Sequence, residues 1–147
     1  MTNEKTVKSL NDILETLIDS TDGYEKAAEV ADRDTLKDFF QSRAASRREM
    51  AADVRSEIVN LGGTPDDDGS ILANVHRMFL TVSSAVQDND EAAIKAVDTG
   101  EEHLREQFED ALANDDLNPS AMILLKKYQG ELRADERLID HLENAAG

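Results

Sequence analysis

The stretch Ser70–Gln87, SILANVHRMFLTVSSAVQ, decides how this chain of 147 residues is arranged. Its apolar side chains recur at steps of three and four residues, which predicts an amphipathic helix with one apolar stripe. The stripe consists of Ile71, Leu72, Val75, Met78, Phe79, Val82 and Val86. At about 1.5 Å per residue the stretch extends roughly 27 Å. It is therefore long enough to carry the chain from one end of a helical bundle to the other.

The sequence on each side of this stretch reads as two long helices joined by a very short turn. The four helices are expected at about 9–31, 34–61, 91–113 and 119–144. Short turns make consecutive helices antiparallel. The sequence thus predicts an all-α fold of two antiparallel hairpins with a crossover helix at 70–87. Because the crossover spans the bundle, the second and third bundle helices should run parallel, with Asp34 and Asp90 at the same end.

Local signals mark the ends of these helices. Asp34 is expected to be the N-cap of the second helix, and Gly62-Gly63 should end it. Asp88 opens the capping sequence of the third helix, and Asn118-Pro119 is a strong signal for the start of the fourth. Gly23 lies inside the first helix, where glycine is unfavourable, and this suggests close helix packing or a local irregularity.

Composition limits the partners of the chain. Asp and Glu number 32 against 16 Lys and Arg, which gives a net charge of -16. Such a surface repels nucleic acid and anionic membranes. The chain has no cysteine, so disulfides and thiolate metal sites are excluded. It also has no long apolar run or signal-peptide core. We expect a single cytoplasmic domain over residues 1–147.

Several segments carry a resemblance to a known family. LNDILETLIDSTDGYEKAA, LKDFFQSRAASRREMAADV, the LGGTP loop and HRMFL together resemble small bacterial ferritin-like four-helix-bundle proteins described as a domain of unknown function. The resemblance spans roughly Leu10 to Asp140, and its most specific piece is His76-Arg77 followed by Phe79. It implies a ferritin-like bundle and little about activity. The chain departs from the family pattern at Asp135, where relatives often carry histidine, and at Asp53, where they tend to carry glutamate.

The inward stripes of the four bundle helices contain charged residues. Arg43, Arg47, Glu101 and Asp135 lie on the stripes, and Glu25 falls near the edge of one. Counting from the hairpin turns places all five at nearly the same height. Charged side chains are almost never fully buried unless they are paired. The sequence therefore predicts either a polar network in the core or a site that binds an ion.

The ion-binding interpretation is a metal site. Glu25, Glu101 and Asp135 could supply oxygen ligands for iron or manganese at mid-bundle. The Glu-x-x-His motif of di-metal carboxylate proteins is absent, and no histidine lies on an inward stripe of the four bundle helices. Two arginines at the same height would also occupy the carboxylates and repel a cation. The sequence favours the network and keeps the metal site as the alternative.

These observations lead to a ranked set of functions. The leading hypothesis is a non-enzymatic, stress-associated interaction or structural module without a cofactor, acting through its surface as a homo-oligomer or with another protein. The alternative is a di-metal carboxylate protein with an oxidase or metal-handling role, which would use iron or manganese. A third hypothesis is that His76 and Arg77 on the crossover bind a small anion or organic ligand against the bundle.

Overall fold

The computed structural model describes residues 2–66, 88–114 and 117–146. They form the helices α1 (Thr2–Val30), α2 (Asp34–Asn60), α4 (Asn89–Leu112) and α5 (Pro119–Ala146). These described ranges contain no strand, so the predicted all-α class is confirmed. The expected crossover helix at 70–87, with His76 and Arg77, lies outside the described residues.

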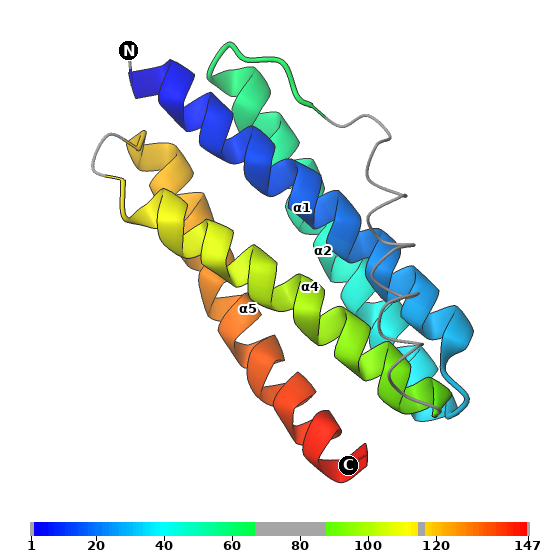
Figure 1. The fold of residues 1–147 in the computed structure, drawn as a ribbon. Helices are drawn as coiled ribbons and strands as arrows, with labels where there is room; N and C mark the ends of the chain where they lie inside the picture. The colour runs from blue at the N-terminus through cyan, green and yellow to red at the C-terminus, as the bar shows by residue number, and fades with distance from the viewer. Residues whose placement is uncertain (1, 67–87, 115–116, 147) are drawn as a thin grey trace.

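The helices pair as two hairpins. Figure 1 shows α1 beside α2 as one hairpin, and α4 and α5 as the second. Asp90, near the start of α4, accepts a hydrogen bond from the backbone N–H of Asp32 at 2.6 Å and another from Arg33 Nε at 3.0 Å. Asp34 and Asp90 are therefore at the same end of the bundle. The prediction that α2 and α4 run parallel is confirmed.

The chain enters and leaves 67–87 at opposite ends of this bundle. Before it, the backbone N–H of Asp66 donates to Asn11 Oδ1 at 2.7 Å, near the start of α1. After it, the α4 N-terminus meets Asp32, just past the end of α1. The described residues on either side of 67–87 therefore contact α1 at Asn11 and just past Val30, toward opposite ends of the bundle, as the spacing of the sequence predicts.

The first helix begins earlier than expected. We predicted its start near Ser9, but α1 begins at Thr2. Its first turns are held by tertiary contacts: the Thr6 hydroxyl accepts the backbone N–H of Asn118 at 3.0 Å, and Val7 packs on the apolar core. Helix ends of low amphipathicity are stabilised mainly by such packing, so the local sequence pattern did not reveal this one.

The predicted caps hold at two of three N-termini. Asp88 caps α4 by accepting the backbone N–H of Asp90 at 3.0 Å, and Asn118 caps α5 by accepting that of Ser120 at 3.0 Å. The expectation that Asp34 caps α2 is wrong, because Arg33 holds the N-cap position without a side-chain cap bond. Asp34 is instead the first helical residue, where a carboxylate still favours the helix dipole.

The glycine pair ends α2 as predicted. Gly62 has φ of 82°, the left-handed conformation that glycine adopts without strain. Its N–H bonds the carbonyl of Val59 at 3.0 Å, and the N–H of Gly63 bonds the carbonyl of Ile58 at 2.9 Å. These two bonds form a Schellman motif, which satisfies the last carbonyls of the helix.

Two apolar clusters fill the bundle, one toward each end. The first includes Leu17, Met50, Leu104 and Leu132, and the second includes Tyr24, Ala44, Val97 and Ile139. On every helix a short interval separates the last residue of one cluster from the first residue of the other. Those intervals define a layer at mid-bundle where the core is not apolar. No helix in the described part of the chain is long and apolar enough to cross a membrane.

Candidate functional site

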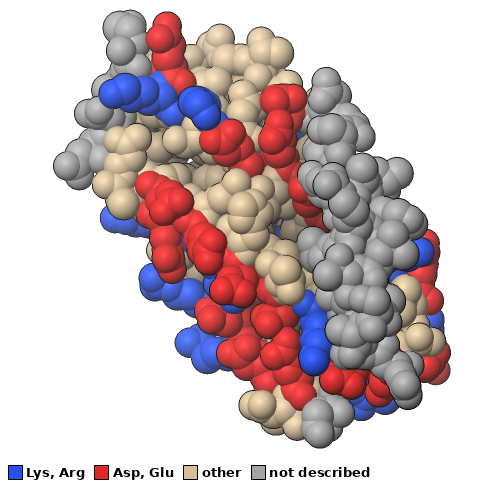
Figure 2. Space-filling model, in the orientation of Figure 1, with Lys and Arg blue, Asp and Glu red and all other residues tan. Residues whose placement is uncertain are grey.

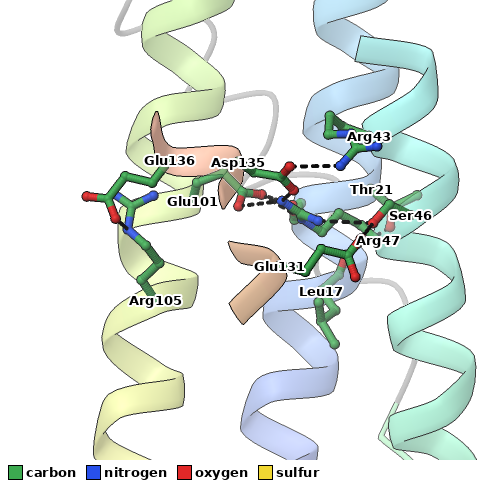
Figure 3. A network of polar contacts seen from close by, with 11 residues as sticks. Leu17, Thr21, Arg43, Ser46, Arg47, Glu101, Arg105, Glu131, Asp135 and Glu136 are labelled. Carbon is green, nitrogen blue, oxygen red and sulfur yellow. Dashed lines mark hydrogen bonds and ion pairs between the residues drawn. The ribbon is translucent and has the colours of Figure 1, made fainter. Parts of the chain in front are cut away.

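Arg47 is the centre of the mid-bundle layer. Its side chain is 0% exposed. Its Nε donates to Glu101 Oε1 at 2.9 Å, and its Nη2 donates to Glu101 Oε2 at 2.8 Å and to Asp135 Oδ2 at 2.7 Å. Figure 3 shows these groups converging from α2, α4 and α5. The paired bonds to Glu101 form the fork geometry in which a guanidinium binds a carboxylate most strongly.

Arg43 and Ser20 complete this group. Arg43 Nη1 donates to the second oxygen of Asp135 at 2.8 Å, and the Ser20 hydroxyl donates to Glu101 Oε1 at 2.7 Å. All four helices therefore contribute a side chain. Two guanidinium groups face two carboxylates, so the charges of the layer sum to zero. We call Ser20, Arg43, Arg47, Glu101 and Asp135 the arginine–carboxylate network.

The surroundings keep Arg47 charged. Burial lowers its pKa, but the charge of Glu101 and the hydrogen bonds to it outweigh burial, so the pKa of Arg47 is raised above its usual value. The Arg47 guanidinium carbon also lies 5.6 Å from the centre of the Tyr24 ring, within cation–π range. Burial and the nearby Glu101 charge raise the pKa of Tyr24 well above its usual value. Tyr24 is therefore a neutral phenol at any physiological pH.

Glu25 does not join the network, so its predicted place in the mid-bundle layer is wrong. Its carboxylate pairs with Arg48 at the surface, where the two side chains are 51% and 60% exposed. Tyr24 faces the core, and the next residue along a helix is turned by about 100°. Glu25 is thereby carried to the outside, and α1 contributes Ser20 to the network instead.

The sequence analysis missed Ser20, although a signal for it exists. Ser20 lies between the inward-facing Leu17 and Tyr24 at steps of three and four residues, so it shares their stripe. A small hydroxyl on an otherwise apolar stripe marks a polar contact in the core. Its side chain carries no charge, so it does not stand out among the charged residues of the inward stripes.

Polar contacts continue between α2 and α5 beside the network. Ser46 donates to Glu131 Oε1 at 2.7 Å, and the Tyr128 hydroxyl donates to the carboxylate of Asp53. Partial burial and the hydrogen bond to Asp53 raise the pKa of Tyr128. On the outer side of α4 and α5, Arg105 lies 3.5 Å from Glu136 (Figure 3).

The network does not fit a di-metal centre. Such a centre needs several oxygen ligands turned toward a common point, with room for the cations between them. Here all four oxygens of Glu101 and Asp135 accept hydrogen bonds from guanidinium groups, and Arg47 places a positive charge between them. Glu25, the third expected ligand, lies at the surface. Across residues 2–66, 88–114 and 117–146, no group of three or more His, Cys, Asp or Glu could hold a metal ion.

The fold and its polar layer define a ferritin-like four-helix bundle whose mid-bundle position is occupied by paired charges. The chain belongs to the family described as Domain of unknown function (DUF2383), whose model matches residues 5–114. No curated protein sequence matches it at a significant level.

A comparison of folds supports the same class. The chain is similar to a protein from Bacillus anthracis str. Ames whose crystal structure is titled as one of "ferritin like, diiron-carboxylate proteins". The TM-score is 0.73 and the identity is 16%, with 97% of this chain and 98% of the other covered. At this identity the match shows a shared fold over the whole length.

Proposed function

We propose that this protein is a non-enzymatic ferritin-like module, in which the arginine–carboxylate network takes the place of a metal centre. The observation that carries this proposal is the position of Arg47, fully buried and bonded to both inward carboxylates. A guanidinium is always protonated in proteins. A divalent cation at the same height would have to displace it or share the carboxylates with it.

We propose further that the protein acts through its surface. Its net charge is -16, and Figure 2 shows Asp and Glu side chains gathered over much of the visible face. Like charges on two copies of this surface repel, so a homo-oligomer would need an interface away from the acidic face or added salt. A partner protein with a basic docking surface would be attracted by the same field. Light scattering at low and moderate salt measures the oligomeric state.

Metal analysis tests the proposal directly. Protein purified without chelator or affinity tag is expected to carry iron and manganese far below one ion per chain. Added Fe(II) under anaerobic conditions, or Mn(II), should leave the melting temperature unchanged. A genuine site would be visible, since a ligand at 100 times its Kd stabilises a fold by about 2.7 kcal/mol.

Glu101→Gln supplies the control for this experiment. If metal binds through the network carboxylates, the variant loses the metal-dependent rise in melting temperature. If the buried charges instead pair with each other in the network, the variant is less stable than the wild type whether or not metal is present. Stoichiometric iron or manganese, with a rise in melting temperature that Glu101→Gln removes, would overturn the proposal in favour of the di-metal alternative.

A further inference from the structure

A cavity of about 280 Å³ lies between α1 and α4, on the side of the bundle away from Arg43. The described residues that line it include Thr16, Asp19, Ser20 and Gly23 of α1, and Ala96 and Gly100 of α4. An engineered apolar cavity of about 150 Å³ is sufficient to bind benzene. This cavity therefore has room for a small organic molecule.

Small residues on both helices, Gly23 of α1 with Ala96 and Gly100 of α4, line the cavity together with the larger Tyr24, Val97 and His103. A Cβ added to Gly23 would meet no described residue within 4 Å, so Gly23 is not in close contact with the other three described helices. On α4, the opposite side of the cavity is lined in part by Ala96 and Gly100, whose side chains extend little from the helix. Glycine inside a helix costs stability, and at Gly23 it leaves open space among the described residues beside the network.

Two described residues of the cavity wall, Asp19 and Tyr24, carry a buried oxygen without a hydrogen-bond partner, and only that of Asp19 belongs to an acid. Asp19 Oδ1 is buried and accepts no hydrogen bond. Burial, together with the charges of Asp22 and Glu15, raises the pKa of Asp19 to about 7. A buried polar atom without a hydrogen bond is costly. The described lining contains no Lys or Arg, and its one basic side chain is His103, which makes no hydrogen bond to this oxygen.

We propose that this cavity is a binding site for a small, mainly apolar molecule that carries one protonated amine. The ammonium donates to the Asp19 carboxylate, and the carbon skeleton packs against Gly23, Ala96 and Gly100. An amine is favoured over a carboxylic acid because Asp22, Glu15 and the net charge of -16 surround the site with negative charge. The site shares Ser20 with the network but uses none of the network's carboxylate oxygens, so it stands whether or not the proposed function holds.

Three probes with the same ring separate the contribution of charge from that of shape. Benzylamine, benzyl alcohol and benzoate are titrated into ¹⁵N-labelled protein and followed by the backbone amide shifts of Thr16–Tyr24 and Ala96–His103. We expect benzylamine to bind most tightly, benzyl alcohol more weakly and benzoate least. Benzoate binding as tightly as benzylamine, or no shift in these two ranges with benzylamine at millimolar concentrations, would overturn the proposal.

Asp19→Asn tests the anchoring carboxylate. The substitution is expected to weaken the binding of benzylamine by about tenfold or more, since a charge-assisted hydrogen bond is lost. The affinity for benzyl alcohol should stay nearly unchanged. Asp22→Asn is the matched control, because it removes the same charge from a neighbouring residue that does not line the cavity. If both variants lower the affinity for benzylamine equally, the general negative charge of the region accounts for binding, and the assignment of Asp19 as the group that binds the ammonium is wrong.

Gly23→Leu tests the cavity itself. The leucine side chain enters open space and gains helix propensity, so the variant should fold. It is expected to abolish binding of benzylamine and benzyl alcohol. Gly130→Leu is the control, since Gly130 also has nothing within 4 Å of an added Cβ but lies on α5, away from the cavity. Benzylamine that binds Gly23→Leu as it binds the wild type would place its site elsewhere and refute the proposal.

Discussion

Replacing Arg47 by alanine tests the arginine–carboxylate network most directly. The wild-type layer holds two positive and two negative side chains. The substitution removes four hydrogen bonds, three to the carboxylates and one to Ser46 Oγ. It leaves a net negative charge at Glu101 and Asp135, which are 1% and 2% exposed. Removing one partner of a buried ion pair typically costs about 3–5 kcal/mol. We expect a loss of that size in the free energy of unfolding.

Urea denaturation followed by circular dichroism measures this loss, and two other arginines calibrate it. Arg43 has a side chain 23% exposed and one bond to Asp135, so Arg43→Ala should cost less than Arg47→Ala. Arg48, next in the chain, pairs with Glu25 at the surface. Exposed pairs contribute about 0–1 kcal/mol, so Arg48→Ala should change stability little. A loss for Arg47→Ala no larger than that for Arg48→Ala would refute the reasoning.

Three further predictions concern the rest of the molecule. Moderate salt should raise the melting temperature, because it screens repulsion within a chain of net charge -16; a melting temperature indifferent to salt would show that the charge is already compensated. The raised pKa of Asp19 means that stability is lost as the pH rises from about 4 to about 7. Asp19→Asn should thus stabilise the protein near pH 8 by about 1–2 kcal/mol, a figure discounted for partial exposure, and change little near pH 4, as urea unfolding at both pH values can check. Gly63→Ala should destabilise the fold, because its Cβ would lie 2.6 Å from Val7 Cγ1, and Gly130→Ala should stabilise it; equal melting temperatures for the two variants would contradict this.

Sequence periodicity predicted the parts of the fold that depend on local pattern and charge. The apolar stripes, the glycine end of α2 and the caps of α4 and α5 follow from residues close together in the chain. The grouping of Arg43, Arg47, Glu101 and Asp135 also follows, because helical phase and distance from the turns fix both the direction and the height of a side chain.

The features that sequence did not predict depend on contacts between distant segments. α1 extends to Thr2 because Thr6 meets Asn118 and Val7 meets the core, and neither contact leaves a local pattern. Glu25 was wrongly predicted to lie in the layer because adjacent residues of a helix point about 100° apart, so one can face the core and the next the solvent. The cavity beside Gly23 could not be foreseen either, since a glycine that permits close packing and one that leaves space are identical in sequence.

The arginine–carboxylate network is better understood as a device that fixes helix register than as a source of stability. Replacing a buried ion pair by apolar residues is often neutral or stabilising, since desolvation offsets most of the attraction. Misalignment has a different cost. A shift of one helix by a single turn, about 5.4 Å, would still place apolar side chains against apolar side chains in the clusters around Leu104 and Ile94. The same shift would part Arg47 from Glu101 and Asp135, now 2.8 and 2.7 Å away, and leave charges buried without partners. The network therefore raises the free energy of misaligned helix arrangements far more than it lowers that of the native arrangement. No metal ion is needed for this effect.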